Sequence, residues 1–448
     1  MSLKPIHLTE FTGKDGKATD EYRRISTRIA HGFHATPGEA EIQDYRARHD
    51  EKSGVVVRGF EDTADLPDWA GGSPKPVATI LGVPMRINVG ASVLGLWGIT
   101  GVSVSSTHRR RGLLREMMQS ELEEAQRNGY PLAALTATEG GIYGRFGFGI
   151  STRLCTYDIN LRSKPRILPE VMEATGAEGG TIVEAEPRDL VELARDLNER
   201  RLQIIPGQIS RSDKIIDDRL GIVSLGEESM KPRLKREAFV YRGAKSVDGF
   251  AVIEHQGREH DVSRAKVVDV QAATTAAWVA LWDHLLQLDL VDSLILDESP
   301  GQPLDALIAN PRNVVLTEDE DLVWTRILDV QKVLEARRYP IDGDLVILVD
   351  DPMGLVTGAY ALRVKNGVGT VTASEELPPV GQRGSTSEDD ADLVPEAPRV
   401  RFSVDRLASA VFRGCKVEAR FGVIRGEGVV HATHLFSVDD EPFCDFDF

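Results

Sequence analysis

The segment GVSVSSTHRRRGLLREMM, residues 101–118, constrains the fold of this 448-residue chain more than any other. Small and β-branched residues run into three arginines, then Gly112, then a helical stripe that continues to about Arg127. The N–H groups of a first helical turn have no partner inside the helix, and the helix dipole adds positive potential there. Gly112 lets a ligand approach the backbone. The segment therefore predicts a strand, an anion-binding turn and a helix in succession.

A pyrophosphate would fit this turn, although two common nucleotide motifs are missing. The chain contains neither a GxxxxGK[ST] loop nor a GxGxxG fingerprint. An exposed basic turn, solvated and without a ligand, is the alternative interpretation. The position of the turn at a strand-to-helix junction favours the anion site.

Apolar periodicity predicts three successive regions of mixed α/β structure. In residues 1–165 we expect helices at 42–49 and 113–127, and strands at 55–60, 77–87, 93–104 and 132–138. In residues 166–325 we expect helices at 187–203 and 274–288, and strands at 238–242, 249–255, 264–272 and 293–296. In residues 326–448 we expect helices at 329–337 and 404–412, and strands at 344–350, 360–365 and 369–373. Residues 374–398, rich in Glu, Asp, Pro, Ser and Gly, predict a mobile surface loop.

Composition narrows the classes of partner. The net charge of −17 disfavours nucleic acid and anionic membranes and would attract small cations. No apolar run approaches the roughly 20 residues that span a bilayer, so we expect no membrane insertion. The first residues lack the apolar block of a secretory signal, so we expect a cytoplasmic protein. Cys155, Cys415 and Cys444 lie far apart, which predicts neither a disulfide framework nor a metal site, and Cys155 should lie in a buried strand.

The basic turn resembles the acyl-CoA loop of GNAT N-acetyltransferases, (Q/R)-x-x-G-x-(G/A). It reads RRRGLL here, with Leu114 in place of a small residue. Together with TATEGGIYGRFGFG at 136–149, it makes the chain similar to the Eis (enhanced intracellular survival) acetyltransferases. The resemblance is strongest over residues 97–152. It extends to WTRI at 324–327, LEAR at 334–337 and the acidic, aromatic end EPFCDFDF.

The resemblance implies an α+β chain of three domains. These are a GNAT domain with the acetyl-CoA site at residues 1–165, a central degenerate GNAT-like domain at 166–325, and a domain like sterol carrier proteins at 326–448. It also implies a homohexamer, a dimer of trimers. The central segment VQAATTAAWVALW has no arginine-rich glycine turn, so we expect one acetyl-CoA site per chain and no metal.

The resemblance further implies direct attack by an amine on acetyl-CoA. The acceptors would be cationic multi-amine compounds such as aminoglycosides, or lysine side chains of peptides. The strands ending at Val104 and Thr138 should part around the thioester. The expected acetyl-CoA contacts are Val102, Val104, Arg109, Arg110, Gly112, Leu113 and Thr138.

Two residues are expected to carry the proton transfers. Tyr143 matches the family's acid, and a tyrosine with a pKa of about 10 is protonated at neutral pH. A packed tyrosine without a catalytic role is the alternative. The resemblance assigns the base to the C-terminal carboxylate of Phe448, and a final strand packed in its domain is the alternative reading of that tail.

The acceptor site is less defined by the sequence. We expect Asp445 and Asp447 to attract a cationic substrate, and Phe33 and His34 to line its pocket. Two other functions stay open at this stage. One is a lipid or sterol carrier built on the last domain, and the other is a regulatory protein that senses CoA.

Overall fold

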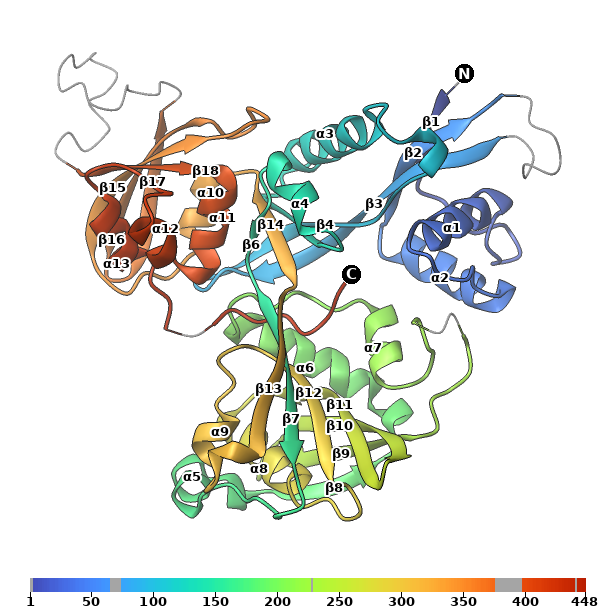
Figure 1. The fold of residues 1–448 in the computed structure, drawn as a ribbon, viewed down its shortest axis with the longest axis vertical. Helices are drawn as coiled ribbons and strands as arrows, with labels where there is room; N and C mark the ends of the chain where they lie inside the picture. Colours follow the sequence, from blue (N-terminus) through green and yellow to red (C-terminus); the bar gives the residue numbers. More distant parts are fainter. Residues whose placement is uncertain (1–2, 65–73, 227–228, 375–396, 440) are drawn as a thin grey trace. The chain divides into compact units, whose positions relative to one another are not determined.

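The computed structural model describes residues 3–64, 74–226, 229–374, 397–439 and 441–448. The loop predicted at 374–398 falls almost wholly outside the described residues. The chain forms two compact units. Figure 1 colours the chain from its N-terminus to its C-terminus. Unit 1 comprises Met1–Thr152, Asp321–Pro442 and Phe446–Phe448, and unit 2 comprises Arg153–Glu320 and Phe443–Asp445. The division into three domains stays a prediction, although the described residues do form three separate sheets.

The first sheet of unit 1 combines an N-terminal set of strands with one strand from far along the chain. Its order is β1-β2-β3-β4-β5-β14-β6. The strands are β1 Leu3–Leu8, β2 Val56–Asp62, β3 Lys75–Asn88, β4 Val93–Val104, β5 Leu132–Thr136, β14 Val323–Ile327 and β6 Gly149–Ile150. β14 pairs with β5 on one side and with β6 on the other, so residues 323–327 complete this sheet.

Helices cover both faces of this sheet. Neighbouring residues of a strand point to opposite faces. Ile80 of β3 packs in the core beneath α3 (Leu113–Arg127), whereas Leu81 packs in the core beneath α1 (Asp20–Gly32). Figure 1 shows α3 and the pair of α1 and α2 (Ala40–Lys52) on the two sides of β3. α1 begins at an N-cap, Thr19, whose hydroxyl accepts from the Tyr22 N–H.

A second sheet of unit 1 is built by the last part of the chain. Its order is β17-β16-β15-β18. The strands are β15 Gly343–Asp350, β16 Gly358–Lys365, β17 Val368–Ser374 and β18 Arg399–Ser403. The helices of this region are α10 Val330–Glu335, α11 Val404–Arg413, α12 Lys416–Arg420 and α13 Val429–Leu435. Leu407 and Val411 of α11 are buried, as their spacing predicted.

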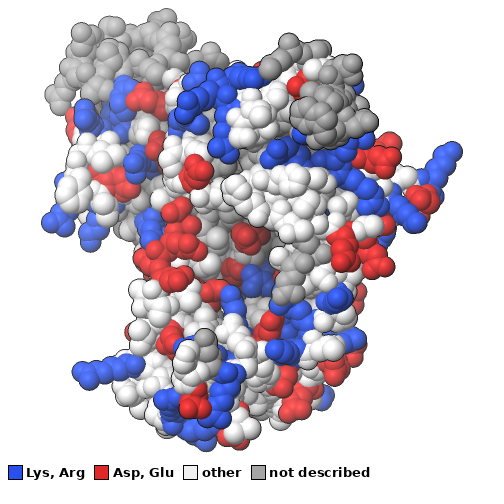
Figure 2. Space-filling view, turned by 45° about the vertical axis from the view of Figure 1, so that its right-hand side comes forward, with Lys and Arg blue, Asp and Glu red and all other residues white. Residues whose placement is uncertain are grey.

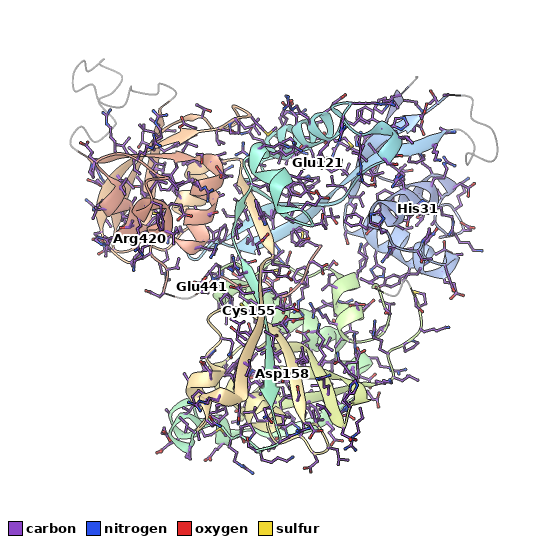
Figure 3. All side chains as sticks on the ribbon, viewed as in Figure 1. His31, Glu121, Cys155, Asp158, Arg420 and Glu441 are labelled. Carbon is purple, nitrogen blue, oxygen red and sulfur yellow. The ribbon has the colours of Figure 1, made fainter. Side chains whose placement is uncertain are left out.

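Unit 2 carries one sheet with the order β13-β7-β12-β11-β10-β9-β8. The strands are β7 Arg153–Asn160, β8 Thr181–Ala185, β9 Arg236–Arg242, β10 Val247–Glu259, β11 Val262–Ala272, β12 Ser293–Glu298 and β13 Val314–Asp321. The helices are α5 Pro169–Thr175, α6 Val191–Ile204, α7 Asp213–Arg219, α8 Thr275–Leu285 and α9 Leu304–Leu307. β7 was expected to belong to the first domain, but it pairs with β12. Its residue Cys155, labelled in Figure 3, is buried in a strand as predicted.

The surface carries both signs of charge. In Figure 2, acidic and basic side chains alternate over the visible face, so the net charge is not gathered there in one acidic patch. In the part of the chain that the structure describes, no helix is long and apolar enough to cross a membrane.

Candidate active site

The site begins where two parallel strands part. β4 and β5 pair only over Leu96–Gly98 and Leu132–Ala134. Beyond this point β4 continues to Val104 beside β3, whereas β5 continues beside β14. Among the described residues, no pairing joins β4 and β5 after Gly98. The backbone of β4 beyond Gly98 is therefore not paired with β5, and an extended ligand could bind along it.

A β-bulge lies within this open part of β4. The register between β3 and β4 shifts between Thr79 and Leu81, and Gly101 has a left-handed φ of 59°. The Thr79 hydroxyl donates a hydrogen bond of 2.9 Å to the Gly101 carbonyl, which fixes the bulge. Bulges re-aim the backbone next to active sites. Val102 and Val104 follow the bulge and are half-buried against the core beneath α3.

The turn after β4 has the form of an anion cradle. Arg110 and Gly112 both take left-handed φ angles, 63° and 82°, and α3 starts at Leu113. A Cβ on Gly112 would meet no atom within 4 Å, so its surroundings are open. Arg109 and Arg110 are exposed, and Arg111 donates to the Thr107 carbonyl at 2.9 Å. The free N–H groups of the first turn of this 15-residue helix point into a basic surrounding.

A further arginine, which the sequence analysis missed, lies beside this turn. Arg28 of α1 is half-buried, and its Nε has no hydrogen-bond partner among the described residues. Burial lowers the pKa of the Arg28 guanidinium, and the charge of Arg109 lowers it further. A bound anion would stabilise these two neighbouring cations.

A buried charge network joins α3 to β4. Glu121 is fully buried, accepts from Trp97 Nε1 at 2.6 Å and pairs with Arg58 at 2.7 Å. Burial raises the pKa of Glu121, and Arg58 opposes that rise. Figure 3 labels this residue on α3. Trp97 directly precedes Gly98, so the network fixes the helix that starts at the anion cradle relative to the point where the strands part. Glu121 is a charged residue within the apolar stripe of α3. This exception to the pattern was the sequence signal that could have identified the network.

Tyr143 lies in a short helix after β5. β5 ends at Thr136, two residues earlier than expected, so Thr138 lies in the exposed turn that follows it. Tyr143 closes α4 (Gly140–Tyr143), is 7% exposed, and packs edge-on against Phe148 with ring centroids 6.2 Å apart. Burial raises the pKa of Tyr143, and the carboxylate of Glu139 raises it further. Its hydroxyl therefore keeps its proton throughout the neutral range.

The last residue of the sequence lies where β4 and β5 part. The Thr136 hydroxyl of β5 donates a 3.2 Å hydrogen bond to the main-chain oxygen of Phe448. A Cβ on Gly98 of β4 would lie 2.6 Å from Met85 Sδ and 3.2 Å from the Phe448 ring, so the ring packs closely against this glycine. Phe446 is buried, and its ring centroid lies 6.2 Å from that of Phe448. Phe448 therefore lies against both strands at the point where they part.

The predicted acceptor residues lie in different settings. Phe33 is 45% exposed, and His34, also exposed, has a left-handed φ of 58°. Both follow Gly32 at the end of α1, where a Cβ would lie 2.2 Å from the Ser103 hydroxyl of β4. Asp447 is exposed. Asp445 belongs to unit 2, where it forms an ion pair with Arg211.

Comparisons with known proteins agree with this geometry. Two models of acetyltransferase (GNAT) domains match residues 17–151 and 207–327. An uncharacterized N-acetyltransferase of Streptomyces avermitilis is 34% identical over 295 residues, which is 64% of this chain and 69% of that protein. N-acetyltransferase Eis of Mycobacterium tuberculosis is 31% identical over 310 residues, 69% of this chain and 73% of that protein. The chain belongs to the Eis family of N-acetyltransferases.

Solved structures with the same fold match nearly the whole of this chain. Eis1 from Mycobacterium abscessus covers 100% of both chains with a TM-score of 0.74 and 22% identity. A GCN5-related N-acetyltransferase from Anabaena variabilis covers 98% of both chains with a TM-score of 0.72 and 17% identity. As an Eis-family GNAT enzyme the protein is an acetyltransferase, and GNAT acetyltransferases use acetyl-CoA. The open cradle at Gly112 and the parted strands fit that cosubstrate.

Proposed function

We propose that this acetyltransferase transfers the acetyl group of acetyl-CoA to a primary amine of a cationic, multi-amine acceptor by direct attack. The reaction takes place where β4 and β5 part. Tyr143 is the acid, and the terminal carboxylate of Phe448 is the base. The observation that carries the proposal is the placement of Phe448 between Gly98 of β4 and Thr136 of β5.

Acetyl-CoA binds along the open part of β4 and over the first turn of α3. The pyrophosphate lies on the N–H groups of Gly112 and Leu113 and receives charge from Arg109 and Arg110. The pantetheine arm runs beside Val102 and Val104, and Thr138 flanks it from the opposite side. The lowered pKa of Arg28 beside Arg109 supports an anion at this place, because an anion would relieve the repulsion between the two cations.

Acetyl transfer from a thioester requires two proton movements. The attacking amine must lose a proton, and the departing thiolate must gain one. Tyr143 suits the second task, since burial and Glu139 keep its hydroxyl protonated. A carboxylate fixed by Thr136 beside the thioester suits the first task, because it accepts a proton within hydrogen-bond reach of the amine.

The acceptor enters from the side of Phe33 and His34, and Asp447 attracts its positive charge. Asp445 was predicted to share this task and stays a predicted substrate contact, but its ion pair with Arg211 gives it a second partner. Aminoglycoside-like compounds and lysine side chains are the acceptor classes that we propose. The sterol-carrier likeness of the last domain, the hexameric assembly and the cytoplasmic location stay predictions.

A thiol-release assay tests the proposal. Purified protein, acetyl-CoA and a panel of mono-amines, polyamines, aminoglycosides and lysine peptides are mixed, and free CoA is measured. Turnover should be fastest with multi-amine cations. If none of these amines is acetylated while acetyl-CoA still binds, the result would instead support a protein that only senses CoA.

A further inference from the structure

The sheet of unit 2 repeats the parting of strands found in unit 1. β11 and β12 pair in parallel only over Arg264–Val267 and Ser293–Leu296, and β11 then continues to Ala272 beside β10. A register shift between Val252 and Ile253 marks a bulge on β11 just past the last pair. α8 follows β11 as α3 follows β4. The residues of β11 from 268 onward therefore occupy the position that faces the cosubstrate in unit 1.

Arginines cover this open part of β11. Arg219 donates to the Val268 carbonyl at 2.6 Å, and Arg201 donates to the Val270 carbonyl at 3.4 Å. Arg211 makes a two-pronged ion pair with Asp269, at 2.7 and 3.1 Å, and is buried with it. These contacts use backbone and side-chain groups that would otherwise face an incoming ligand. The central domain thus holds its own side chains where a CoA arm would lie.

The same arginines hold the C-terminal tail. Arg211 forms an ion pair with Asp445, and Arg219 donates to the main-chain oxygen of Asp445 at 2.5 Å. The N–H of Phe443 donates to the Pro206 carbonyl at 3.0 Å, and Cys444 between them is fully buried. Burial acts to raise the pKa of Asp445, but Arg211, Arg219 and Arg201 together lower it below its usual value. Asp445 is therefore a charged, half-buried group held by Arg211, in the loop before α7, and by Arg219 of α7.

We propose that the opening between β11 and β12 is a clamp for the C-terminal tail, with Asp445 as the residue it grips. Phe448 follows Asp445 by three residues, at most about 10 Å of extended chain, so the clamp limits where the last residue can go. A carboxylate confined in this way meets the amine far more often than one on a free tail. Asp445 is then a positioning residue for the reaction, a role that rests on the proposed function of Phe448.

The clamp gives the central GNAT domain a use other than acetyl-CoA binding. Asp269 alone would already balance the charge of Arg211, yet Arg211 also binds a second carboxylate, that of Asp445 in the tail. Gln271 supports the arrangement from β11, since its side-chain amide donates to Asp269 at 2.7 Å. A segment of the chain itself thus lies at the position in unit 2 that corresponds to the parted strands of unit 1.

The test compares two matched variants of the full chain. Asp445→Asn keeps the shape of the side chain, removes its charge, and leaves Arg211 paired with Asp269. Glu441→Gln removes one charge from an exposed residue four positions earlier, at the start of the tail in Figure 3. Two quantities are measured for each protein. One is the rate at which a carboxypeptidase releases Phe448, and the other is kcat together with the KM for acetyl-CoA.

Asp445→Asn should speed the release of Phe448 about 10- to 100-fold, the range for losing a charged hydrogen bond. It should lower kcat while the KM for acetyl-CoA stays within about twofold, and Glu441→Gln should match wild type in both. Asp445→Glu, which keeps the charge, should release Phe448 more slowly than Asp445→Asn. If Asp445→Asn does not fold, Arg219→Gln takes its place, because it weakens the contact to the main-chain oxygen of Asp445.

The outcomes separate the clamp from the proposed base. Faster release with an unchanged kcat would uphold the clamp and reject Phe448 as the base. Release at the wild-type rate in both Asp445→Asn and Arg219→Gln would overturn the clamp, whatever happens to kcat.

Discussion

The hydroxyl of Thr136 donates a hydrogen bond of 3.2 Å to the main-chain oxygen of Phe448, across 312 positions of sequence. This contact brings the last residue to the end of β5, near the point where β4 and β5 part. Thr136→Val keeps the shape of the side chain and removes the donor. We expect kcat to fall about two- to tenfold, the scale of one hydrogen bond. Thr136→Ser keeps the hydroxyl and is the control. Steady-state kinetics in which valine and serine behave alike would show that the contact does not position the tail.

The arginines of the anion cradle should govern acetyl-CoA affinity. Arg109→Ala and Arg110→Ala should each weaken binding by about 1 to 3 kcal/mol, because each loses a charged contact to the pyrophosphate. The KM for acetyl-CoA should rise, and calorimetric titration with CoA should show the same loss. Arg127→Ala, at the exposed last position of α3, is the matched control. Unchanged affinity in the Arg109/Arg110 double variant would place the pyrophosphate elsewhere.

Tyr143→Phe isolates the proton of the proposed acid. The ring keeps its edge-on contact with Phe148, so folding and acetyl-CoA binding should be nearly unchanged. We expect kcat to fall about 100-fold or more, within the range of general acid catalysis. A kcat within twofold of wild type would mean that another group protonates the thiolate.

Glu298 should make the stability of the protein depend on pH. Burial raises the pKa of this carboxyl, at the end of β12, from 4.5 to about 7. Between these two pH values the folded chain holds a proton that the unfolded chain has lost. The stability that the protonated carboxyl contributes is therefore full below pH 4.5 and disappears as pH rises through about 7. Glutamine does not titrate. Glu298→Gln should therefore gain stability relative to wild type between pH 5 and pH 8, by up to about 3 kcal/mol.

Thermal melts at several pH values measure this difference. Glu173→Gln, an exposed change on α5, should show no such trend. A difference in stability between Glu298→Gln and wild type that stays constant from pH 5 to pH 8 would contradict the raised pKa of Glu298.

Local patterns predicted the strand and the helix on either side of the basic turn well. β4 was expected at its observed bounds, and so was α3, because β-branched residues, a glycine and an apolar stripe act over neighbouring positions. The end of β5 was misplaced by two residues, since the turn after it has no strong breaker before Gly140. α1 was missed because its polar surface hides a narrow apolar stripe that includes Tyr22 and Ile25.

Contacts between distant segments could not be read from the sequence. β14 joins the first sheet by pairing with β5, and nothing in residues 323–327 names that partner. Likewise, no local feature of Asp445 indicates Arg211, which lies 234 positions away. Such pairings follow from how whole sheets assemble, so only the structure reveals that the two aspartates of the tail lie in different surroundings.

The central claim is that the carboxylate of Phe448 accepts the proton of the amine. Its most direct test is kcat for a chain extended by Gly-Ser after Phe448, compared with one that carries the same extension at the N-terminus. The C-terminal extension turns the carboxylate into an amide, which cannot act as a base, while Phe446 and Asp445 keep their contacts. We expect kcat to fall about 100-fold or more, with an unchanged melting temperature and acetyl-CoA affinity. Turnover at the wild-type rate by the C-terminally extended chain would contradict the claim.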